Sequence, residues 1–103
     1  MKKQQAVILN SKDNVATAVT DLPVGTKVNI ECQNQVLEVT MVDNIPFGHK
    51  FAVRSIEKEK DIIKYGESIG RAVCDITKGH YVHIHNVESK RGRGDWEKEV
   101  KTS

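Results

Sequence analysis

Cysteine, proline and aromatic residues are all scarce in this 103-residue chain, which has two cysteines, two prolines and five aromatics. Cys32 and Cys74 show no CxxC or other metal-ligand spacing, so neither a zinc-finger site nor a disulfide framework is expected. We expect both thiols to be small buried side chains, because free cysteine is among the most buried residue types.

A strong net charge is also absent. Sixteen basic and fourteen acidic residues leave a formal charge of +2, which creates no field that would attract polyanions, so nucleic-acid binding is not expected. Long apolar runs are missing as well. Residues 6–9 are the only apolar run near the start, far short of a signal-peptide core or a membrane span. We therefore expect a cytoplasmic protein without a membrane partner.

The chain does contain short apolar runs rich in β-branched residues, set between turn signals, while helical periodicity is hard to find. Such runs are typical of a compact all-β domain, and a chain of this length can bury one modest core. Ala16, Thr17 and Ala18 leave the segment 14–20 open between a strand and a short helix. We expect strands at residues 6–9, 15–19, 28–31, 36–42, 51–53, 69–73 and 81–85.

An eight-residue pattern recurs along the chain. Each copy has an Asx residue, an apolar residue, two turn residues, a glycine, two polar or amphipathic residues and an apolar residue. Glycine supplies a positive φ, and an Asx side chain can bond nearby backbone, so each copy predicts a tight turn that launches a strand. Unequal spacing argues against a solenoid. The three copies are Asp21-Leu22-Pro23-Val24-Gly25-Thr26-Lys27-Val28, Asn44-Ile45-Pro46-Phe47-Gly48-His49-Lys50-Phe51 and Asp75-Ile76-Thr77-Lys78-Gly79-His80-Tyr81-Val82.

Two stretches are rich in charge. The run Glu57-Lys58-Glu59-Lys60-Asp61 has mixed sign and no aromatic residue, and we expect a solvated loop or turn there. After Asn86 the composition shifts to charged residues and glycine, with a lone Trp96. We therefore expect one domain over residues 1–88 and a flexible tail or linker remnant over 89–103, with Trp96 docking on a partner.

Several motifs, in their order and spacing, resemble the amino-terminal domain of altronate and galactarate dehydratases over nearly the whole chain. The resemblance implies a SAF domain with the all-β β-clip fold. The motifs are Asp13-Asn14-Val15-Ala16, Ile45-Pro46-Phe47-Gly48-His49-Lys50-Phe51-Ala52, Lys64-Tyr65-Gly66-Glu67-Ser68-Ile69-Gly70-Arg71-Ala72, His83-Ile84-His85-Asn86 and Arg91-Gly92-Arg93-Gly94-Asp95.

The resemblance also implies a function. Relatives carry this domain either fused to a large catalytic domain or as a separate chain, and this chain resembles the separate small subunit of a sugar-acid dehydratase. Altronate or a related hexonate or hexarate is the expected substrate, a large catalytic subunit the expected partner, and a homo-oligomer is left open. The small subunit of a sulfolactate sulfo-lyase and a non-catalytic SAF ligand-binding module are the alternatives. We expect a lyase subunit that is inactive alone, because so small a domain supplies only part of a water-excluding site.

Dehydration of a hydroxy acid needs a base beside the carboxylate and an acid for the departing hydroxyl, and a divalent metal assists both. Family resemblance makes iron or manganese the candidate metals. His83 and His85 are one residue apart on an expected strand, which would place both rings on one face and Ile84 in the core. We predict them as metal ligands, although two strand histidines without a ligand would show the same spacing.

The catalytic candidates are His49 and Glu67. His49 follows the glycine of the second turn, where it can serve as base, metal ligand or plain turn residue. Glu67, between the expected turn glycines Gly66 and Gly70, can serve as acid, base or support for a histidine, or be a solvated carboxylate.

The predicted substrate-binding residues are Lys50, Asn86, Arg91 and Arg93. Lys50 can pair with a carboxylate, and the Asn86 amide can orient a hydroxyl. Arg91 and Arg93 can clamp a carboxylate or grip acidic groups of the large subunit, and their flanking glycines favour docking. His80 is expected to be structural.

Overall fold

The computed structural model describes residues 5–32 and 34–88, and within these residues it contains strands and turns but no helix. The all-β prediction is confirmed, and no helix in this part of the chain could cross a membrane. The strands are β1 (Ala6–Val7), β2 (Val15–Ala18), β3 (Lys27–Cys32), β4 (Gln35–Thr40), β5 (Lys50–Ala52), β6 (Asp61–Lys64), β7 (Glu67–Ala72), β8 (Tyr81–Val82) and β9 (Val87–Glu88).

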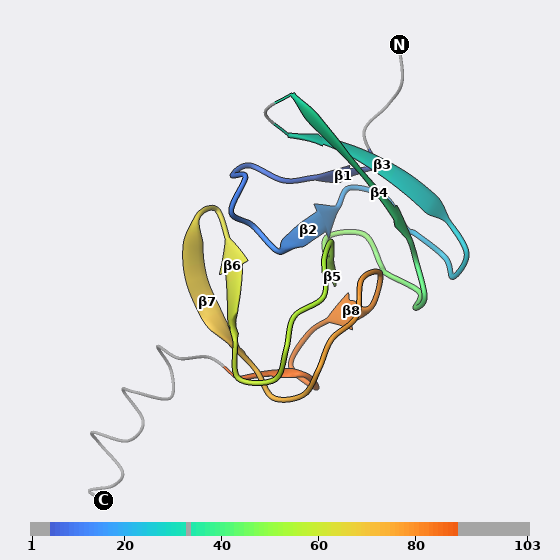
Figure 1. Cartoon of the computed structure of the whole chain (residues 1–103). Helices are drawn as coiled ribbons and strands as arrows, with labels where there is room; N and C mark the ends of the chain where they lie inside the picture. Colours follow the sequence, from blue (N-terminus) through green and yellow to red (C-terminus); the bar gives the residue numbers. More distant parts are fainter. Residues whose placement is uncertain (1–4, 33, 89–103) are drawn as a thin grey trace, which may run out of the picture.

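The strands form three antiparallel arrangements: a sheet in the order β1-β2-β5-β8, the hairpin β3-β4, and a sheet in the order β6-β7-β9. Figure 1 shows the β3–β4 hairpin and the β6–β7 hairpin on opposite sides of β2, β5 and β8. Apolar side chains on the central sheet alternate between two cores, as a period of two requires. Phe51 of β5 packs in the core beside β3 and β4, whereas the next residue, Ala52, packs in the core beside β6 and β7.

The expected turns are present, and the structure adds a fourth at residues 55–62. Each turn is closed by a bond of 3.0 to 3.1 Å from its fourth N–H to its first carbonyl, at 23–26, 46–49, 57–60 and 77–80. The third residue has a positive φ in all four: 91° at Gly25, 86° at Gly48, 75° at Glu59 and 92° at Gly79. Such a φ is typical of a type II turn. The loop or turn expected at the charge run is therefore a strand-launching turn, with Glu59 standing where the other copies have glycine.

The four turns join in two pairs. Leu22 and Ile45 exchange two backbone hydrogen bonds of 2.8 Å, and Ile56 and Ile76 do the same. The apolar residues of the first pair lie in one core and those of the second pair in the other. Asx side chains strengthen the pairing by accepting a backbone N–H from the opposite turn. These bonds join Asp21 to Phe47, Asn44 to Val24 and Asp75 to Lys58 at 2.8 to 2.9 Å.

Some local predictions were wrong. The helix alternative at 14–20 fails because β2 occupies that segment, and β6 and β9 were not predicted. The strand expected at 81–85 ends at Val82, after which residues 83–86 form a turn, so Ile84 is 83% exposed rather than in the core. The cysteines are not buried either: Cys32 is half-buried and Cys74 is exposed where the chain leaves β7, and both are free thiols.

We predict that Gly79→Ala destabilises the protein more than Gly25→Ala. Both replacements place a side chain at positive φ, which costs about 1–2 kcal/mol. A Cβ at Gly25 meets nothing within 4 Å, whereas a Cβ at Gly79 overlaps the backbone carbonyl of Thr40. Overpacking of this kind adds about 1–3 kcal/mol. Thermal and urea unfolding of the two variants measures the difference, and equal losses would contradict the close approach at Gly79.

Candidate functional site

Four ring-bearing side chains meet beside β5 and β8, and we call them the histidine cluster: His49, Tyr81, His83 and His85. The Tyr81 ring stacks on His83 with centroids 5.3 Å apart and planes at 7°. Its centroid lies 5.5 Å from that of His49 and 5.6 Å from that of His85. The rings of His49 and His83 are 5.1 Å apart. The structure therefore brings together the three histidines predicted as functional, around a tyrosine that was not predicted.

Tyr81 also holds His49 directly. Its hydroxyl oxygen lies 2.7 Å from His49 Nδ1, and both residues are half-buried. A phenol can donate to imidazole or accept from it, so this bond fixes the orientation of the His49 ring and leaves Nε2 for another partner. Tyr81 was not identified from the sequence, because its partner His49 lies 32 residues earlier in the chain. Its position two residues before His83 was the available signal.

Asn86 holds the turn that carries His83 and His85. This residue is only 6% exposed. Its Nδ2 donates to the carbonyl of Tyr81 at 2.8 Å, and its Oδ1 accepts the N–H of His83 at 2.9 Å. These bonds end β8 and bend the chain, so both histidines reach Tyr81 from a turn rather than from a strand. The role of Asn86 in substrate binding stays a prediction.

Lys50 follows His49 in sequence but lies on the other face of the sheet. The register pairs Lys50 with Val82 and Phe51 with Tyr81, and paired side chains share a face. Lys50 and Val82 line a groove of about 300 Å³ with His83 and three aliphatic side chains, Ile69, Ile84 and Val87. We call it the Lys50 groove. Only His83 belongs to both the groove and the histidine cluster.

The Lys50 ammonium is partly desolvated in this groove. Burial lowers the pKa of Lys50 below the ordinary value of 10.5, and the nearby positive charge of Lys64 lowers it further. Within the part of the chain that the structure describes, no carboxylate lies within ion-pair distance of Lys50, since the ion pairs there join Lys27 to Glu38 and Arg71 to Glu88.

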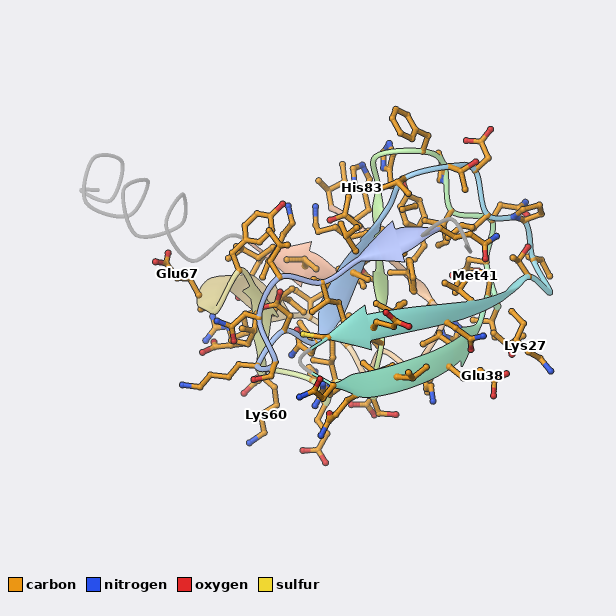
Figure 2. The ribbon with its side chains drawn as sticks, turned by 90° about the horizontal axis from the view of Figure 1, so that it is seen from above. Lys27, Glu38, Met41, Lys60, Glu67 and His83 are labelled. Carbon is orange, nitrogen blue, oxygen red and sulfur yellow. The ribbon has the colours of Figure 1, made fainter. Side chains whose placement is uncertain are left out.

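Glu67 lies at the start of β7, directly after a two-residue turn. Tyr65 and Gly66 both have positive φ, 56° and 78°, as a type I′ hairpin requires. Figure 2 shows Glu67 well apart from His83, and among the described residues no hydrogen bond or ion pair connects it to a histidine. Gly70 is not a turn residue: it lies in β7, where the backbone of Glu88 approaches too closely for a Cβ. The catalytic role of Glu67 stays a prediction.

The described residues do not form a self-contained metal site. They contain no group of three or more histidine, cysteine or acidic side chains placed to hold an ion. His83 and His85 would supply two imidazoles at most, fewer than the ligands that metal sites need. Of the other candidates, His80 Nδ1 contacts Thr77 Oγ1 within its own turn at 2.5 Å, and Arg91 and Arg93 lie outside the described residues.

Comparison with known proteins gives consistent matches. The family model for the altronate/galactarate dehydratase SAF domain matches residues 4–90. The chain is 41% identical over 85 residues to altronate dehydratase of Escherichia coli strain K12, which covers 82% of this chain and 16% of that protein. It is 44% identical over 59 residues to (2R)-sulfolactate sulfo-lyase subunit alpha of Chromohalobacter salexigens, covering 57% of this chain and 63% of that subunit. The corresponding subunit of Paracoccus pantotrophus is 37% identical over 62 residues, covering 60% of this chain and 92% of that subunit.

We predict that Lys50→Met raises the thermal midpoint at neutral pH, because it removes a charge that the groove desolvates without pairing. Because its pKa is lowered, Lys50 loses its proton at a lower pH in the folded protein than in the unfolded chain. The charged Lys50 therefore destabilises the fold fully at any pH below the folded-state pKa. This destabilisation decreases as pH rises from the folded-state pKa toward 10.5. Unfolding curves from pH 7 to 11 should show the gain of Lys50→Met shrinking at high pH. The exposed Lys78→Met is the control, and an equal, pH-independent effect of both would contradict the desolvation of Lys50.

Proposed function

The chain belongs to the SAF-domain family of altronate and galactarate dehydratases, and on that premise we propose that it is the small subunit of a sugar-acid hydro-lyase. Altronate or a related hexonate or hexarate is the proposed substrate. The histidine cluster carries the proposal, because it places three proton-exchanging or ligating rings around one tyrosine on a small β scaffold. The same proposal places the chain in the cytoplasm.

In the proposed reaction, the proton beside the substrate carboxylate leaves to a base and the neighbouring hydroxyl departs as water after protonation. Histidine takes and returns protons near neutral pH. We assign the proton transfer to His49 Nε2, since Tyr81 occupies Nδ1. His83 and His85 orient substrate oxygens. A divalent metal, iron or manganese, would take most of its ligands from the large chain.

The division into two chains has its own support. Two of the chain's relatives, from Chromohalobacter salexigens and Paracoccus pantotrophus, are named (2R)-sulfolactate sulfo-lyase subunit alpha, and that name implies at least one further chain in those enzymes. A water-excluding active site needs more surface than one small domain provides. The large partner therefore completes the site, and the small chain alone is inactive.

A second candidate is the small subunit of a sulfolactate sulfo-lyase, which would release sulfite instead of water. The observation that favours it is coverage: the match extends over 92% of the Paracoccus subunit alpha. Both candidates need proton removal beside a carboxylate, so the same histidine cluster serves either reaction, and the large chain would select the leaving group.

We predict that the purified chain shows no turnover of altronate, galactarate or sulfolactate, and that addition of its large partner chain restores one of these activities. Coupled assays for the keto acid and for sulfite identify the reaction. His49→Ala should lower kcat of the assembled enzyme about 10²- to 10⁴-fold, the range for a lost general acid or base.

His80→Ala is the matched control, because among the described residues the His80 side chain bonds only within its own turn. Full activity of the isolated chain would refute the division between two chains. Unchanged kcat in both His49→Ala and His83→Ala would refute the role of the cluster.

A further inference from the structure

The Lys50 groove has walls that do not suit a sugar acid. Ile69, Val82, Ile84 and Val87 supply aliphatic side chains to its lining. A hexonate carries a hydroxyl on nearly every carbon, and hydroxyls buried against aliphatic walls lose hydrogen bonds to water without replacement. The groove therefore serves something other than the substrate assigned to the histidine cluster.

The rim of the groove carries an unusually exposed apolar residue. Ile84 is 83% exposed, and Ile69, which also lines the groove, is 38% exposed. Ile84 sits on the turn that Asn86 holds by two side-chain bonds to backbone. A large aliphatic side chain held in water by an ordered turn beside an apolar groove is typical of a protein interface.

The charge of the groove indicates which polar group its ligand should carry. The Lys50 ammonium is half-buried, has Lys64 as a cationic neighbour, and lacks an ion-pairing carboxylate among the described residues. A carboxylate entering the groove would restore to Lys50 the charge stabilisation that burial removes. The complementary ligand is aliphatic and acidic at once.

We propose that the Lys50 groove is the docking site for a segment of the large partner chain in which an aliphatic residue neighbours an aspartate or glutamate. The aliphatic side chain packs against Ile69 and Ile84, and the carboxylate pairs with Lys50. This inference rests on the proposed two-chain enzyme. His83 lines the groove and stacks on Tyr81. The docked segment would therefore contact the histidine cluster through His83.

The first test measures association of the full chain with its large partner by titration calorimetry. Ile84→Asp and Lys50→Glu should each weaken the affinity about tenfold or more, because one puts a charge into the apolar contact and the other repels the carboxylate. The matched controls lie on the β3–β4 hairpin: Val36→Asp, at a residue that is 61% exposed, and Lys27→Glu. Both controls should bind like the wild type, and His49→Ala should assemble normally yet lose activity.

The second test places the photo-crosslinker p-benzoylphenylalanine at position 84 or at position 36. A cross-link to the large chain from position 84 alone supports the docking site. Cross-linking from position 36 alone, or to a second copy of this chain from position 84, overturns it.

The remaining outcomes separate the two proposals. If the wild type assembles and the Ile84 and Lys50 variants bind as tightly as the controls, the docking site is wrong while the two-chain function stands. Altronate that shifts the NMR signals of Lys50 and Ile69 in the isolated chain would also overturn docking. A wild-type chain that fails to associate with the large chain would overturn both.

Discussion

Backbone hydrogen bonds from four tight turns hold this fold together. The third residue of each turn has a positive φ, and its N–H reaches a carbonyl on a distant segment at 2.7 to 2.8 Å. Strands of two to six residues make few ladder bonds of their own, so these long-range bonds decide how the sheets meet. The donor–acceptor pairs are Gly25 to Met41, Gly48 to Ala18, Glu59 to Ala72 and Gly79 to Ala52.

The histidine cluster depends on further backbone bonds of the same turns. His49 closes one turn, and its carbonyl accepts the N–H of Ala18; Tyr81 follows another turn, whose His80 carbonyl accepts the N–H of Ala52. The rings of His49 and Tyr81 therefore leave the backbone at points that the core already holds. These backbone bonds bring together the two ends of the Tyr81–His49 bond, which are 32 residues apart in sequence.

The all-β class and three of the turns could be predicted from the sequence, because glycine and Asx residues carry strong local preferences at such turns. The charge run indicated a loop or turn but not a fourth strand-launching turn, since Glu59 adopts a positive φ for which a charged run gives no signal. The placement of His83 and His85 on one face was predicted from strand alternation, but these rings meet His49 through a turn shaped by Asn86 and through contacts with Tyr81. Neighbouring residues of a strand point to opposite faces, so the separation of Lys50 from His49 could have been predicted. Their adjacency in sequence instead suggested a shared site.

Because the turns form two similar pairs, each position in one pair has a counterpart in the other pair. The residue after the closed turn is Lys50 in one half and Tyr81 in the other, and the apolar residue that follows packs into a different core in each half, Phe51 in one and Val82 in the other. The two halves therefore offer two corresponding positions on opposite faces of a shared sheet. One carries the Tyr81 ring of the histidine cluster, and the other carries the half-buried ammonium of Lys50. The same turn geometry therefore presents an aromatic ring on one face of the sheet and a cation on the other.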